Sequence, residues 1–238
     1  MLGMVATYKI AEMVVGSKTF PQDTAPSAVS APGSNLFGWV EIFIVFGLLE
    51  AVFWTPRSVG HSFLIASLVG SVLWFTLRGY SREELGLVWP SGRDTGWILV
   101  AGSAMAAAIP AVAVATGHTV PANPDWPKFQ NLWPYVIWAF AQQFLLLSFF
   151  YLRMESLVGI RWAAWASTIL FTLAHLPNMT LTAMTFLGAL FFTEMFRRYR
   201  SIFPLGIVHA LLGIAIAFSF PNSLMHHMRV GLSFWQLR

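Results

Sequence analysis

Long apolar runs alternate with short polar segments along most of the chain. A membrane-spanning α-helix needs about 20 consecutive apolar residues, and each run has close to that length. The polar segments between the runs, such as TPRSVG and VPANPDWPKF, are rich in turn-forming residues. The pattern therefore predicts an all-α polytopic membrane bundle of about seven transmembrane helices. The predicted spans are residues 36–54, 62–79, 96–116, 132–153, 161–177, 180–197 and 203–219.

The composition excludes an ordinary soluble domain. Of the 238 residues, 57% are hydrophobic and only 10% are charged, and the mean hydropathy is +0.66. Soluble domains have about 25% charged residues. The chain has no cysteine, which excludes both disulfide bonds and a thiol nucleophile.

The apolar runs divide the chain into three parts. Residues 1–34 form an amphipathic and flexible N-terminal segment, which lacks the basic start and long apolar core of a cleavable signal peptide. Residues 35–220 form the transmembrane helical domain. Residues 221–238 form a C-terminal tail that is too short to span a membrane.

The Lys and Arg residues indicate the orientation of the chain. They are scattered in short loops despite a pI of about 9.8, a pattern typical of membrane proteins and not of a nucleic-acid-binding surface. Ten lie in the N-terminal segment and in the loops after the second, fourth and sixth spans, and four lie on the other side. We therefore expect an integral protein of a prokaryotic inner or plasma membrane, in contact with membrane lipid and not with nucleic acid, whose N-terminus is cytoplasmic.

Few strongly polar side chains interrupt the predicted spans, and such residues in a membrane are functional candidates because they are costly to bury. They are Glu41, Glu50, Gln142, Gln143, His175, Glu194 and His209.

Gln142 and His175 lie equally far from the middle of the turn that joins the fourth and fifth spans. In an antiparallel helix pair they reach the same depth, which predicts a hydrogen bond between them. A bond of this kind has two interpretations. It belongs to a functional pocket, or it only joins two helices and contributes about 0.6–2 kcal/mol.

Glu194 and His209 are placed in the same way around the next turn, between the sixth and seventh spans. One interpretation is a carboxylate that orients or titrates His209. The other is an ion pair at the helix end, because Arg197 and Arg198 follow Glu194 at positions i+3 and i+4.

Two motifs resemble those of a known family. The segment FTLAHLPN places Phe171 four residues before His175, and SIFPLGIVHALLG contains His209. Together with REELGLVWPSGRDTGW before the third span, they resemble the CPBP family of CAAX-protease and bacteriocin-processing membrane proteins. The resemblance covers about residues 80–219.

The resemblance implies an intramembrane endopeptidase site at particular positions. The family carries a pair of glutamates followed, after three intervening residues, by an arginine. These positions hold Gln142, Gln143 and Leu147 in this chain. The glutamate and the two family histidines are taken to activate a water molecule, and the histidines correspond to His175 and His209.

The family's last motif also differs in this chain. An asparagine thought to stabilise the oxyanion usually follows the second histidine, and Gly213 occupies its position. A glutamine cannot replace the catalytic glutamate as a base, because an amide does not titrate. The site therefore has both histidines but neither the acids, the arginine nor the asparagine.

Two main functional hypotheses follow. The first is a degenerate family member that binds another membrane protein, a lipophilic ligand or a lipidated or membrane-anchor peptide, or that serves as a subunit of a membrane assembly. The alternative is an active endopeptidase that cleaves prenylated or membrane-anchor segments. Its site would use His175, His209, Gln142 and Gln143, with Glu194 as an orienting carboxylate.

Two other functions, a metal site and a transporter, are weaker hypotheses. The two histidines have no evident third ligand for zinc, and no cofactor is identified. A transporter would be expected to show paired half-helices or an inverted repeat, and the sequence shows neither.

The sequence does not by itself bring the two histidines together. His175 and His209 are 34 positions apart, and counting along straight helices leaves them about 10 Å apart in depth.

Overall fold

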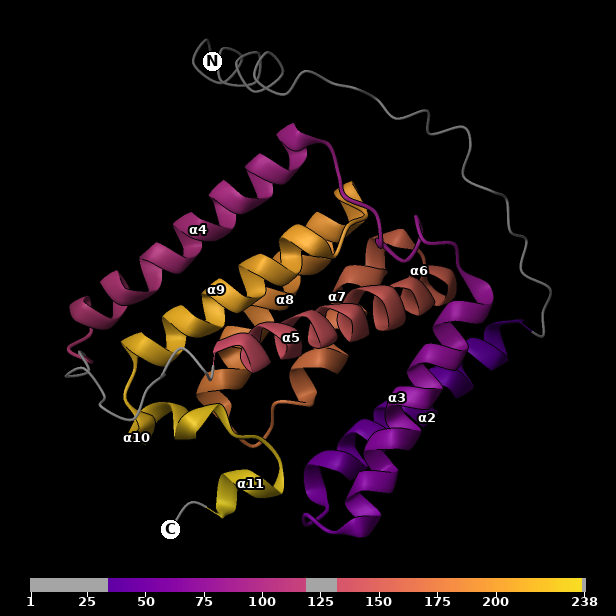
Figure 1. Ribbon diagram of the computed structural model, residues 1–238, viewed down its shortest axis with the longest axis horizontal. Coiled ribbons are helices and arrows are strands. Elements are labelled where there is room, and N and C mark those ends of the chain that lie inside the picture. Colours follow the sequence, from indigo (N-terminus) through magenta and orange to yellow (C-terminus); the bar gives the residue numbers. More distant parts are fainter. Residues whose placement is uncertain (1–33, 119–131, 237–238) are drawn as a thin grey trace, which may run out of the picture. The chain divides into compact units, whose positions relative to one another are not determined.

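The computed structural model describes residues 34–118 and 132–236, all within one compact unit, and these residues form helices and no strand (Figure 1). The N-terminal segment predicted over residues 1–34 lies almost wholly outside the described residues. The all-α class is confirmed. The main helices are α2 (Ser34–Trp54), α3 (Val59–Gly79), α4 (Gly92–Ala115), α5 (Leu132–Gln143), the π-helix η3 (Phe144–Tyr151), α6 (Leu152–Val158), α7 (Ile160–Leu173), α8 (Met179–Tyr199) and α9 (Phe203–Ser219). Three short helices follow, α10 (Asn222–Met225), η4 (His226–Met228) and α11 (Leu232–Trp235).

Five helices of the described chain are long and apolar enough to cross a membrane. Four of them lie within α2, α3, α4 and α8, and the fifth is the continuous segment Leu132–Val158 formed by α5, η3 and α6. Helix α9 is also apolar but has only 17 residues. These helices and their composition confirm an integral membrane protein, with five long spans where the sequence predicts about seven.

Helix α7 is shorter than predicted. It ends at Leu173, after 14 residues, whereas the apolar run continues to residue 177. Pro177 cannot continue a helix, and the preceding residues form a turn that ends at Asn178, the N-cap of α8. His175 therefore lies in this turn and not inside a transmembrane helix.

Local sequence signals fix several helix ends. The side chains of Ser58, Ser91 and Asn178 each accept a hydrogen bond from the backbone three residues later, which satisfies one free N–H group of α3, α4 and α8. Gly159 separates α6 from α7 with a φ of 79°, a conformation that glycine adopts without steric cost. Pro204 lies in the first turn of α9, where its missing N–H group has no helical partner to lose.

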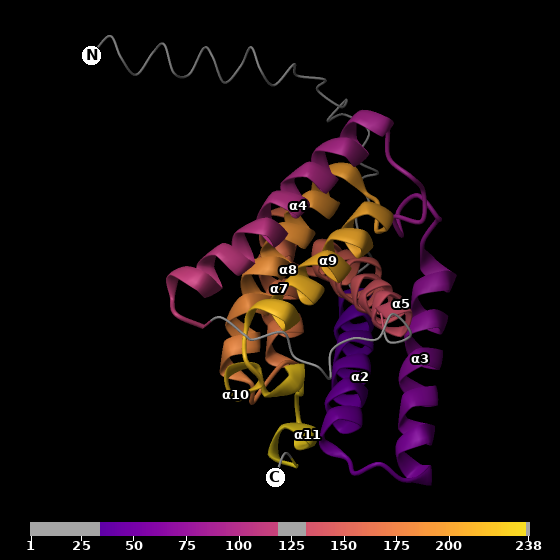
Figure 2. The same cartoon turned by 60° about the vertical axis from the view of Figure 1, so that its left-hand side comes forward.

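The segment Leu132–Val158 is the central element of the fold. Half of its most apolar window is buried, against 11–28% in the other four long spans. Helix α5 packs against α9, which also pairs along its length with α4, and α7 pairs with α8 (Figures 1 and 2). The side chains that could hold a ligand therefore come from α5 itself and from the helices packed around it.

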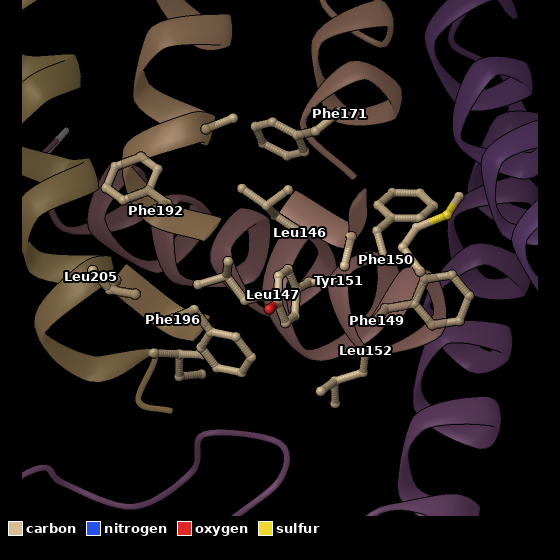
Figure 3. Packing of buried hydrophobic residues seen from close by; sticks show 14 of the residues in the cluster. Leu146, Leu147, Phe149, Phe150, Tyr151, Leu152, Phe171, Phe192, Phe196 and Leu205 are labelled. Atoms are coloured by element: carbon tan, nitrogen blue, oxygen red, sulfur yellow. The ribbon is translucent and has the colours of Figure 1, made fainter. Parts of the chain in front are cut away.

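The π-helix η3 supplies three of the four fully buried aromatic side chains of the described core. Phe149, Phe150 and Tyr151 are fully buried, and the ring of Tyr151 meets the ring of Phe196 edge to face at 5.5 Å (Figure 3). The i+5 hydrogen bonding of a π-helix widens the helix and reduces the angle between consecutive side chains. Within this stretch, Ser148 Oγ donates to the carbonyl of Leu85 at 2.7 Å.

A buried arginine joins the first two helices to the central segment. Arg153, only 3% exposed, donates from Nε to Glu41 at 3.0 Å and from Nη2 to the carbonyl of Phe75 at 2.6 Å. Its guanidinium carbon lies 4.9 Å from the ring of Tyr80 and 4.5 Å from the ring of Phe149. These contacts join α2, α3 and α6 at one buried charge, so Glu41 has a structural role.

Substitution of Glu41 tests this role. We expect Glu41→Gln to lower the free energy of unfolding by about 3 kcal/mol, because it leaves the buried Arg153 without its counter-ion. The matched control is Glu194→Gln, which removes the ion pairs of a one-third-exposed carboxylate with Arg197 and Arg198 and should cost no more than about 1 kcal/mol. Unfolding of the purified protein in mixed detergent micelles measures both values. Equally small losses would contradict the structural role of Glu41.

Candidate functional site

A cavity of about 340 Å³ lies between α4, α5, α8 and α9, and the turn after α7 and the C-terminal segment also line it. Its walls are mainly apolar, with side chains such as Met105, Trp138 and Met184. Against this lining, the side chains with hydrogen-bonding groups are Tyr135, Gln142, His175, Thr185 and His209, together with the indole N–H of Trp138. The size and character of this cavity are those of a small-ligand site.

The turn after α7 fixes the ring of His175. Its Nδ1 donates to the carbonyl of Phe171 at 2.8 Å, and the two rings lie 5.0 Å apart. Because a carbonyl only accepts hydrogen bonds, the proton of the neutral ring is on Nδ1. The lone pair of Nε2 is then available as a hydrogen-bond acceptor.

A glutamine fixes the ring of His209. The amide nitrogen Nε2 of Gln143 lies 2.9 Å from His209 Nδ1, and the ring of Phe192 stacks on the imidazole at 5.3 Å. An amide nitrogen only donates, so Nδ1 of His209 accepts and its Nε2 carries the proton. The two histidines therefore have opposite tautomers, one with an accepting Nε2 and the other with a donating Nε2.

The predicted hydrogen bond between Gln142 and His175 is wrong. The glutamine that bonds a histidine is Gln143, and its partner is His209 on α9. Depth along a helix does not fix the direction of a side chain, and adjacent helical residues point about 100° apart. Gln143 therefore points to α9 and is fully buried, whereas Gln142 lines the cavity.

The predicted pairing of Glu194 with His209 is also wrong. The carboxylate of Glu194 accepts hydrogen bonds from Arg197 at 2.7 and 2.8 Å and from Arg198 at 2.7 Å. It does not line the cavity. The ion pair at the helix end, the alternative interpretation of its sequence, is confirmed.

The two histidines share one cavity, although counting along straight helices separates them by about 10 Å in depth. The count places His175 inside a straight fifth span, but this residue lies in the turn after α7. The fold therefore joins His175, His209 and Gln142 in one site, with Gln143 behind His209.

Tyr135 is a polar group of the site that the sequence analysis missed. It lies on α5 and lines the cavity opposite Gly213 of α9. A Cβ atom on Gly213 would be 1.5 Å from the Tyr135 hydroxyl oxygen, so the hydroxyl group occupies the space of a side chain at position 213. A single tyrosine in an apolar run does not indicate this contact, because the two residues are 78 positions apart in the sequence.

No carboxylate lines the cavity within the described part of the chain. The same residues contain no cluster of three or more His, Asp or Glu side chains that could hold a metal ion. Leu147, at the position of the family arginine, is fully buried in the apolar core. The chemistry available in the cavity is that of neutral donors and acceptors in an apolar environment, strong enough to orient a ligand or a water molecule.

The fold is that of a helical membrane protein, and its mainly apolar cavity holds a few polar side chains. Residues 124–215 match the family model described as Type II CAAX prenyl endopeptidase Rce1-like, a range that includes Gln142, His175, His209 and Gly213. This match confirms the resemblance of the segment to the CPBP family, the family that the sequence motifs indicate. No curated protein and no solved structure matches the chain.

The opposite tautomers of the two histidines are measurable. In protein labelled with ¹⁵N-histidine at a pH where both rings are neutral, we expect His175 to be protonated at Nδ1 and His209 at Nε2. The variants His175→Ala and His209→Ala assign the signals. Gln143→Leu removes the donor to Nδ1 and should remove the tautomer preference of His209 without changing that of His175. The same tautomer in both rings would contradict this description.

Proposed function

We propose that this protein binds a lipophilic or lipid-anchored ligand in its intramembrane cavity and does not hydrolyse it through a carboxylate-activated water. The observation that carries the proposal is the pair Gln143–His209. A neutral amide occupies the position of a family glutamate and donates to the ring of the second family histidine.

The direction of this hydrogen bond opposes general base catalysis at His209. The donated hydrogen bond occupies the Nδ1 lone pair, and Nε2 carries the ring proton. A carboxylate at the same position would accept a proton, hold the imidazole in the other tautomer and stabilise its charged form. The amide supplies none of these effects, so His209 acts as a hydrogen-bond donor to whatever fills the cavity.

The surroundings of the glutamines also favour binding over hydrolysis. Gln143 is fully buried, and its Oε1 atom has no hydrogen-bond partner within the described residues. An ionised group there would be deprived of water and of any counter-charge, because Leu147 stands at the position of the family arginine. The cavity beside it is also suited to uncharged groups, because no Asp, Glu, Lys or Arg lines it within the described residues.

One observation favours a second function, hydrolysis with His175 as the base. The Nδ1 proton of His175 is held by the carbonyl of Phe171, and its Nε2 is an acceptor at the cavity wall. A neutral histidine oriented in this way is able to take a proton from water. His209, with a proton on Nε2, would then donate to the developing oxyanion.

Hydrolysis by the purified protein distinguishes the two functions. The substrates are fluorogenic prenylated C-terminal peptides and membrane-anchor peptides, presented in proteoliposomes. We expect the wild type to release no more product than His175→Ala, while a photoreactive copy of the same peptides labels the protein. The control for labelling is an excess of the same peptide without the photoreactive group.

Hydrolysis by the wild type that His175→Ala abolishes would contradict the binding proposal and establish an enzyme with a histidine base.

The double variant Gln142→Glu/Gln143→Glu tests whether the site lacks only its carboxylates. Positioned acid–base groups contribute about 10²–10⁴-fold to rates, so turnover that appears only in this double variant identifies the missing carboxylates as the cause of inactivity.

A further inference from the structure

A second pocket, of about 730 Å³, lies where the first half of α2 meets the end of α3 and α6. We call it the α2–α3–α6 pocket. Within the described residues it shares no lining residue with the cavity that holds His175 and His209. The function proposed above therefore leaves it unexplained. Its polar side chains are Glu41, Arg78, Tyr80, Arg153 and Ser156.

Arg153, which lines this pocket, has an unused hydrogen-bond donor. Its Nε donates to Glu41 and its Nη2 to the carbonyl of Phe75, but Nη1 is buried and has no hydrogen-bond partner among the described residues. A buried charged donor without a partner is costly, so it indicates a partner that the protein does not itself supply. Nη1 is covered by its neighbours, so a ligand oxygen reaches it through a small movement of the pocket wall.

The charges of the pocket favour an anion. Arg153 is balanced by Glu41, whereas Arg78 is exposed and has no ion-pair partner within the described part of the chain. The lining has two arginines and one carboxylate, which leaves a net charge of +1. Phosphate is an anion that suits such a site, because its oxygens accept several charge-assisted hydrogen bonds from guanidinium groups. The hydroxyl groups of Tyr80 and Ser156 lie in the same lining.

An apolar stripe on α2 extends the pocket beyond these charges. Phe37, Val40 and Ile44 are exposed, line the pocket and follow one another at helical spacing on one side of α2. A free phosphate ion makes no use of this wall, whereas a phospholipid places an acyl chain along it while its phosphate contacts the arginines. The pocket lies at the predicted cytoplasmic end of the spans, where basic residues attract anionic lipids.

We propose that the α2–α3–α6 pocket binds one anionic phospholipid. Its phosphate lies between Arg78 and Arg153, and an acyl chain runs along Phe37, Val40 and Ile44. The lipid supplies the missing partner of Arg153 Nη1 and neutralises the excess charge of the pocket. Because Arg153 joins three helices, the bound lipid stabilises their packing. This site is separate from the cavity, so it does not depend on what the cavity binds.

Native mass spectrometry of the full-length protein released from detergent micelles tests the proposal. The probes are dioleoyl phosphatidylglycerol, which is anionic, and dioleoyl phosphatidylcholine, which has the same chains and a head without net charge. Inorganic phosphate serves as a competitor without chains. We expect one phosphatidylglycerol to bind more tightly than phosphatidylcholine, and excess inorganic phosphate to leave it bound. Equal binding of the two lipids would overturn the proposal. Displacement by phosphate would overturn it in favour of a free-phosphate site.

Replacement of Arg78 tests the charge. Arg78→Gln should weaken phosphatidylglycerol binding about tenfold, as the loss of one charge-assisted hydrogen bond does. The matched control is Arg82→Gln, which removes an exposed positive charge four positions further along the chain, outside the pocket lining, and should weaken binding much less. Equal losses in the two variants would show attraction to basic charge in general and would overturn the assigned site.

A second pair of variants tests the apolar wall without changing any charge. Val40→Trp fills the pocket beside Glu41 and should displace the lipid. Val69→Trp is the matched control, because Val69 of α3 is also exposed and lies outside the pocket lining. Phosphatidylglycerol should raise the unfolding temperature of the wild type and of Val69→Trp, and not that of Val40→Trp. Wild-type lipid affinity in Val40→Trp would overturn the proposal.

Discussion

The absence of water in the membrane interior constrains the buried polar side chains of the described helices. Gln143 has no access to solvent, so its amide finds a partner within the protein, His209 on another helix. The same constraint joins Arg153 to Glu41 and to the carbonyl of Phe75. These hydrogen bonds and the packing of the helices therefore depend on each other, since each bond fixes which helix faces meet.

Much of the fold could be predicted from the sequence, because apolar length and turn residues are local signals. The runs that became α2, α3, α4, α8 and α9 were located within a few residues. The end of α7 was missed because hydrophobicity continues through the turn up to Pro177. The π-helix was missed as well, because its residues are as apolar as those of an α-helix.

The candidate site was predictable only in part. The motif around His175 and the position of His209 marked both rings, and the family model covers both. Their partners were assigned wrongly because the rotation of a helix about its axis is set by packing and not by depth. Thus Gln143 and not Gln142 bonds a histidine, and Glu194 bonds the arginines next to it. Tyr135 became visible only with the three-dimensional contact to Gly213.

The contact between Tyr135 and Gly213 also has a historical consequence. With the tyrosine ring in its present position, a side chain at position 213 would collide with the Tyr135 hydroxyl group, so the ring has to turn away before such a side chain fits. A lineage that changes position 213 while the tyrosine is present therefore has to move this ring. A lineage that first places a smaller residue at position 135 avoids the collision. The second order of substitutions is the easier one.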